Sequence, residues 1–231
     1  MKLGLLFKDE LLGFYKSKVM IFLWIGLPVI ALLFRFISGA STGQEIPFTL
    51  VSSIVVSSIG GTLASVMLAV FLINETNRHV YDLFLIRPIR RRDIILAKFL
   101  SVYCCVAIAS FIAVLAGIVV DFATTGTLSS TVLTDAGQSL ANSLSMIAVS
   151  CAAGVIIGIV SPSVLVGAIL VIYGGNQISV IPLVPTLLNL PEPTILTIVI
   201  AGVVAASLLA GAVALFNQKQ FYKQPQLASL L

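Results

Sequence analysis

The one long charged stretch in this otherwise apolar chain reads Asn74-Glu-Thr-Asn-Arg-His-Val-Tyr-Asp-Leu-Phe-Leu-Ile-Arg-Pro-Ile-Arg-Arg-Arg-Asp-Ile-Ile-Leu-Ala-Lys98. It holds six of the thirteen Lys and Arg residues, and a long apolar run lies on each side of it. Apolar runs of that length enter a bilayer, whereas a dense set of charges stays at its surface. The stretch therefore predicts a surface connection between two membrane spans.

The overall composition also predicts a membrane protein. Of the 231 residues, 59% are hydrophobic and only 10% are charged. A soluble domain of this length needs more charge to cover its surface. The net charge of +4 does not indicate nucleic-acid binding, because the basic residues flank apolar runs instead of lining a soluble module.

Six apolar runs are long enough to span a bilayer, which takes about 20 residues. We expect an all-α transmembrane domain over residues 19–216, with spans at about Val19–Ile37, Thr49–Ile73, Phe99–Val120, Ser139–Val160, Ser163–Ile181 and Thr194–Phe216. Only Ser161-Pro162-Ser163 separates the fourth span from the fifth. Because Pro162 breaks helical hydrogen bonding and about 40 residues are too long for one span, we expect a tight hairpin there.

The distribution of basic residues predicts the orientation. Twelve of the thirteen lie in the N-terminal segment, in the 74–98 connection or in the 217–231 tail, all on one side if there are six spans. Arg35 is the exception, near the outer end of the first span. Since basic residues mark the cytoplasmic side, both termini are expected in the cytoplasm, in a multi-pass protein of a prokaryotic-type plasma membrane.

Two further segments have a helical character of their own. In residues 1–18, Leu3, Phe7, Leu11 and Phe14 share one helical face, which predicts an amphipathic helix in the cytoplasmic interface. The alternative is a plain extension of the first span. Residues 176–193 hold four prolines among apolar residues and predict a re-entrant helical segment in the outer leaflet. The alternative there is a long outer loop after a frayed span.

Small residues recur every four positions in the second span. The stripe comprises Ser53, Ser57, Gly61, Ser65 and Ala69. Such a stripe lets another helix approach closely, and it could also leave a weakly polar wall along a translocation path. Packing is the simpler interpretation. Similar patterns occur at Gly154 and Gly158 in the fourth span and at Gly202, Ala206 and Ala210 in the sixth.

The sequence offers no catalytic, metal or nucleotide motif. There is no GxSxG elbow, no HExxH pair and no GxxxxGK[ST] phosphate loop. The one histidine, His79, lies in the charged connection, and the three cysteines lie in apolar runs. We therefore expect no enzyme and no cofactor or metal on this chain. No span centre carries a clear ionisable residue, which argues against proton- or sodium-driven transport.

The charged connection resembles that of the ABC-2 type permeases, the membrane subunits of ATP-binding-cassette exporters. The residues that match the family pattern in order are Glu75, Asp82, Leu83, Leu85, Pro88, Arg91, Ile95, Leu96 and Lys98. His79-Val80-Tyr81 stands where the family has Gly-Thr-Leu. The interfacial helix, the six spans and the broken apolar segment before the last span extend the resemblance over nearly the whole chain.

The resemblance implies a mechanism. Two permease subunits, identical or homologous, would pair, and each would dock a separate ATPase subunit that binds ATP and Mg²⁺. The docking would use the coupling residues of the 74–98 segment, Glu75, Arg78, Asp82, Leu83, Pro88, Arg91 and Lys98. Without charge at mid-membrane, the cargo is expected to be apolar or amphipathic. The alternatives are a non-transporting scaffold that docks a partner through the same segment, and an intramembrane enzyme acting on lipid.

Overall fold

The computed structural model describes residues 2–15, 18–39, 56–77, 91–125, 130–188 and 193–221. Within these ranges the chain is helical almost throughout and forms no strand. η1 and η2 are π-helical turns and η3 is a 3₁₀ turn. The elements are α1 (Lys2–Tyr15), α2 (Lys18–Gly39), η1 (Val56–Gly60), α4 (Gly61–Asn77), α6 (Arg91–Thr125), α7 (Ser130–Val160), α8 (Val164–Leu170), η2 (Val171–Gly175), α9 (Asn176–Ser179), η3 (Ile181–Leu183), α10 (Val184–Leu187) and α11 (Pro193–Phe221).

Five helical stretches within the described ranges are long and apolar enough to cross a membrane. They are Val56–Asn77, Arg92–Val120, Ala136–Val160, Val164–Leu183 and Thr194–Phe216. The expectation of an all-α, multi-pass membrane protein is confirmed at this level. The predicted first span coincides with α2, which has 22 residues and Pro28 in its interior. Because α2 is not among the five, the sixth span and the orientation of the termini stay predictions.

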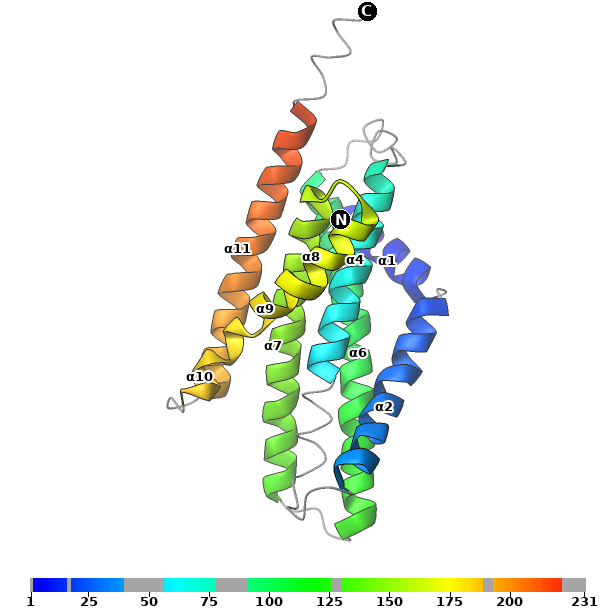
Figure 1. Ribbon diagram of the computed structural model, residues 1–231, viewed down its shortest axis with the longest axis vertical. Helices are drawn as coiled ribbons and strands as arrows, with labels where there is room; N and C mark the ends of the chain where they lie inside the picture. The colour runs from blue at the N-terminus through cyan, green and yellow to red at the C-terminus, as the bar shows by residue number, and fades with distance from the viewer. Residues whose placement is uncertain are drawn as a thin grey trace, which may run out of the picture.

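The helices are arranged around α7 (Figure 1). α7 packs against α4, α6 and α11, and α2 and α1 pack against α6. Of the candidate spans, 72% of the α7 span is buried inside the protein, against 17% of the α11 span. Helix α11 therefore offers most of its surface to the surroundings, and in a membrane protein an apolar surface of that kind faces lipid.

The chain reverses between α7 and α8, as the sequence predicts (Figure 1). Helix α7 ends at Val160 and α8 starts at Val164. The Ser163 hydroxyl accepts a hydrogen bond from the Val166 amide at 3.4 Å and so caps α8. The Ser161 hydroxyl donates to the Ser163 carbonyl at 3.1 Å, which gives the turn a second polar contact.

The segment after α8 stays helical further than the sequence suggests. The fifth candidate span reaches Leu183 and so takes in residues 176–183 of the predicted re-entrant segment. Pro182 and Pro185 lie in the first turns of η3 and α10, where a missing amide hydrogen removes no helical bond. Prolines thus divide this segment into short helices without ending it. Residues 189–192 lie outside the described ranges, and the re-entrant path stays a prediction.

The small-residue stripe of the second span lies against α7. Ser57, Gly61, Ser65 and Ala69 are all buried. A Cβ added at Gly154 would come within 2.6 Å of the Ser65 carbonyl oxygen, and one added at Gly158 within 2.9 Å of the Ala69 Cα. The two backbones approach so closely here because glycines of α7 face the small side chains of α4.

The corresponding pattern in the sixth span does not pack against the other described helices of this chain. Gly202, Ala206 and Ala210 are exposed, and a Cβ added at Gly202 would meet nothing within 4 Å. Helix α11 uses the adjacent face, where Ala201 and Ala205 pack against Val149 and Ala152 of α7. A shift of one residue turns a helix by about 100°, so neighbouring small residues lie on different faces.

The contrast between these two glycines predicts the result of one matched pair of variants. We expect Gly154→Ala to lower the stability of the protein by about 1–3 kcal/mol, because the new methyl group meets the backbone of α4. Gly202→Ala should leave stability unchanged or raise it slightly. Thermal unfolding of both variants in the same detergent measures the difference. An unchanged midpoint for Gly154→Ala would contradict the close α4–α7 contact.

Candidate functional site: the Lys98 ion network

The N-terminal helix α1 is docked on the protein by its apolar face. Phe14 is buried, and its ring meets that of Phe71 on α4 edge to face, with centroids 5.1 Å apart. Phe14 and Leu11 also join the core cluster that includes residues of α6. The face that the sequence marks as apolar is therefore covered in large part by protein.

Three helices each carry one charged residue within a buried stripe. Glu10 of α1 lies three positions after Phe7 and four before Phe14, on the docked face. Glu75 of α4 continues the buried row that includes Leu72. Lys98 of α6 lies four positions after buried Ile94. Helical spacing thus places all three charges on surfaces that face other helices.

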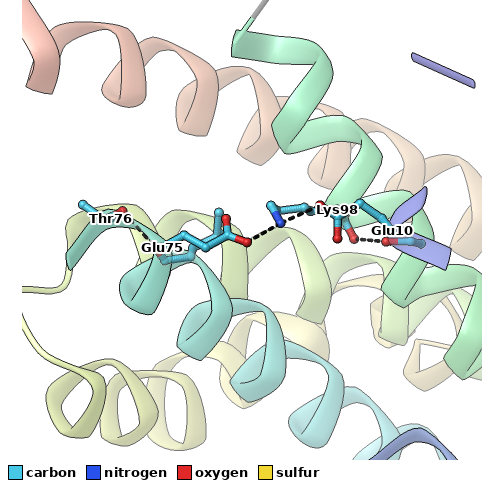
Figure 2. A network of polar contacts seen from close by, with 6 residues as sticks. Glu10, Glu75, Thr76 and Lys98 are labelled. Carbon is cyan, nitrogen blue, oxygen red and sulfur yellow. Dashed lines mark hydrogen bonds and ion pairs between the residues drawn. The ribbon is translucent and has the colours of Figure 1, made fainter. Parts of the chain in front are cut away.

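The three charged groups meet in one ion network (Figure 2). The Lys98 Nζ donates to Glu75 Oε1 at 2.6 Å and to Glu10 Oε1 at 2.7 Å. The Lys98 side chain is 5% exposed, whereas the Glu10 and Glu75 side chains are 27% and 23% exposed. The cation is therefore enclosed, and the two carboxylates lie between it and the surface.

The network is held at the end of the bundle where α4 finishes and α6 begins. The Thr76 hydroxyl, next to Glu75, bonds back to the Leu72 carbonyl at 2.7 Å. At the start of α6, Asp93 lies in the first turn, where the helix dipole favours a negative charge. Its partner is Arg92 at 3.7 Å, and the Arg92 side chain is 55% exposed. The cation of this second pair is thus far more exposed than Lys98, whose side chain is 5% exposed.

The enclosed position of Lys98 explains why this cation needs carboxylate partners. An enclosed cation must be paired, because leaving water without a partner is costly. The second carboxylate adds attraction to Lys98 but also repels the first, and partial exposure reduces that repulsion. Lys98 consequently has two carboxylate partners, one from α1 and one from α4.

The structure brings together two of the seven predicted coupling residues. Glu75 and Lys98, 23 positions apart, are directly paired. Arg91 is the first residue of α6, and its side chain is not described. The other four, Arg78, Asp82, Leu83 and Pro88, lie at 78–90, outside the described residues. The two ends of the predicted coupling segment are thus joined by an ion pair. The coupling role of all seven residues stays a prediction.

Glu10 is the member of the network that sequence reasoning did not identify. The signal was present, because Glu10 interrupts the helical face that includes Phe7, Leu11 and Phe14. A carboxylate inside an apolar face predicts a basic partner on the surface that covers it. The position of that partner, Lys98, could not be read from the sequence.

The residues predicted for packing or a pathway form a separate polar contact. The Gly61 carbonyl accepts from the Ser65 hydroxyl at 2.7 Å and from the Ser150 hydroxyl at 2.8 Å. The Ser65 and Ser150 hydroxyl oxygens lie 3.0 Å apart. Ser57 is buried in the same row, and Ser53 lies outside the described residues. These contacts join α4 to α7, as in helix packing.

No protein-family model, no curated protein and no solved structure matches this chain. Over the described ranges, no group of three or more His, Cys, Asp or Glu residues could hold a metal ion. What this part of the chain does bring together is an ion network that joins three helices. The chemistry it offers is charge pairing, through which the position of one helix affects the other two.

Removing the cation should therefore cost more than removing an ordinary surface charge. We expect Lys98→Met to destabilise the protein by about 3 kcal/mol, because two carboxylates are left close together and only partly hydrated. Arg92→Gln also removes one positive charge from α6 and should cost less than about 0.5 kcal/mol. Thermal or denaturant unfolding in detergent gives both values.

A second substitution tests whether the cost arises in the network. In the Lys98→Met background, Glu10→Gln should restore part of the lost stability, since it removes one of the two unpaired carboxylates. Equal stability of Lys98→Met and Arg92→Gln would contradict the enclosed position of Lys98.

Proposed function

We propose that the chain is the membrane permease subunit of an ATP-driven exporter of the ATP-binding-cassette type, coupled to a separate ATPase through the 74–98 segment. The observation that carries this proposal is the direct Glu75–Lys98 pair, which ties the end of α4 to the start of α6. A segment that is displaced by a soluble partner transmits this displacement to the membrane domain most directly when both of its ends are fixed to the helices that must move.

The composition of the segment supports docking to a partner. Its basic residues are interspersed with Leu83, Phe84 and Ile86, so it offers apolar contacts as well as charge. The sequence contains no phosphate loop, so the proposed ATPase is a different chain. The five apolar candidate spans supply the membrane domain that such a partner would drive.

The remaining parts of the proposal follow from the same assignment. Two copies, or one copy and a homologue, would pair in the plasma membrane with both termini in the cytoplasm. Each would bind one ATPase. The cargo would be apolar or amphipathic, because the described spans carry no Asp, Glu, Lys, Arg or His near their centres that could bind a charged one.

A non-transporting scaffold that uses the same segment for docking is the second candidate. The α4–α7 contact favours it in one respect, because the small-residue stripe is occupied by packing within the chain. Transport into sealed vesicles containing the permease and its ATPase separates the two functions. Cargo movement that depends on ATP supports the exporter, and docking without cargo movement supports the scaffold.

The docking assignment is tested by reversing charges in the segment. Glu75→Ala with Arg78→Glu disturbs both the segment and the Lys98 network, so the sharper variant is Arg78→Glu with Asp82→Arg and an intact Glu75. We expect this double reversal to reduce, by at least about tenfold, the ATPase activity that co-purifies with the tagged chain from its native membrane.

The control for this experiment is Lys8→Glu, a charge reversal on the exposed side of α1 outside the segment. It should leave the co-purifying ATPase unchanged. Full ATPase recovery and full ATP-dependent transport with the Arg78 and Asp82 reversals would refute the coupling role of the segment.

A further inference from the structure

The candidate span Val164–Leu183 carries polar side chains on its outer surface. Only 22% of this span is buried inside the protein, and most of its exposed residues are apolar, as contact with lipid requires. Tyr173 is different, because it is 75% exposed and lies at the middle of the 20-residue span. Gln177, also exposed, follows one helical turn later on the same side. The two residues thus place a phenol and an amide on a surface that is otherwise apolar.

A polar side chain on a span can be satisfied by its own helix, as Ser207 of α11 shows. Ser207 is exposed, and its hydroxyl donates to the Val204 carbonyl at 2.8 Å. Neither Tyr173 nor Gln177 has a side-chain hydrogen bond to any described residue. The phenol hydroxyl lies too far from the backbone for the local bond that a serine makes. These two groups therefore need a partner from outside the described part of the chain.

The surrounding lipid cannot supply that partner. Hydrocarbon offers no hydrogen-bonding group, so a phenol or an amide in contact with it stays unsatisfied. A helix rises about 1.5 Å per residue, so roughly 15 Å separate Tyr173 from each end of the span. Its side chain cannot cover that distance to reach water or headgroups. A protein surface with matching polar groups at the same depth would satisfy both residues.

A second copy of the same chain has such a surface. The tyrosine hydroxyl and the glutamine amide can each donate and accept a hydrogen bond, so the two residues complement a second set of themselves. In a symmetric pair the same patch faces itself, and equal residues lie at equal depth in the membrane. At Gly174, a Cβ would meet nothing within 4 Å, which leaves room for another helix beside Tyr173.

We propose that Tyr173 and Gln177 form the polar centre of a contact between two copies of this chain within the membrane. The inference rests on the proposed function in so far as that function requires paired membrane subunits, and it deepens it by naming the partner and the contact surface. The contact itself needs neither an ATPase nor a cargo. Pairing can therefore be measured separately from transport, and failure of one assignment leaves the other standing.

The first test measures pairing in lipid vesicles by energy transfer between labelled full-length chains at a series of protein-to-lipid ratios. Tyr173→Phe with Gln177→Leu removes both polar groups and nearly preserves their volume. We expect the dissociation constant of the pair to rise at least about tenfold, because each copy loses two hydrogen-bonding groups. Ser207→Ala also removes a polar group from an exposed span surface, but one that its own helix already satisfies, and should leave the constant unchanged.

Both substituted positions are exposed, so the double variant should fold, and its thermal unfolding in detergent checks this. An unchanged dissociation constant in the double variant, or an equal rise in Ser207→Ala, overturns the contact.

A second test uses the chain without loss of the aromatic side chain. Tyr173→benzoylphenylalanine places a photoreactive ring in the proposed contact, and illumination of native membranes should give a crosslinked product of two copies. Ile198, 51% exposed on α11, provides the control position, where the same replacement should capture lipid. The absence of a crosslinked pair at Tyr173 overturns the proposal, whether the probe captures lipid, a different protein or nothing.

Discussion

The ammonium group of Lys98 lies where α1, α4 and α6 meet, and its need for negative partners links these helices. Glu75 approaches it from α4 and Glu10 from α1, at 2.6 and 2.7 Å. An enclosed cation gives little net stability compared with apolar side chains of the same volume, but it strongly disfavours any arrangement that leaves it unpaired. The network therefore defines which helix ends can lie together at this end of the bundle.

The rest of the bundle is held by contacts of another kind. In a bilayer, apolar side chains gain little by leaving lipid for protein, so helices associate through close packing and hydrogen bonds. Helix α7 uses both against α4, because Gly154 admits the Ser65 backbone and Ser150 bonds to the Gly61 carbonyl. Helix α11 packs on α7 through alanines and leaves most of its surface exposed. The α4–α7 pair is thus a closely packed contact at the centre of the bundle, whereas α11 packs on α7 and α1 packs mainly on α6.

Sequence patterns predicted the helices well, because apolar runs of membrane length have few alternatives to a helix. The turn at Ser161–Ser163 and the involvement of Glu75 and Lys98 in one segment were also accessible from the sequence. The Glu10–Lys98 contact was not, since 88 positions separate these residues and nothing local relates them. The small-residue pattern at Gly202, Ala206 and Ala210 did not identify the face by which α11 packs on α7, because a helix rich in small residues has no periodicity that selects one face. The fifth span, predicted at about Ser163–Ile181, ends at Leu183, because Pro182 and Pro185 lie in first helical turns, where proline is tolerated.

The exposure of the three charged groups around Lys98 decides how strongly the site constrains the helices that meet there. If all three groups were enclosed, separating any of them would leave charge without water or partner, and the site could only be static. If all three were exposed, solvent would weaken the contact until it positioned nothing. Here the cation is enclosed while both acids keep about a quarter of their surface exposed. Lys98 therefore needs at least one of the two carboxylates, so a stable arrangement at this end of the bundle keeps α1 or α4 paired with α6 through this cation.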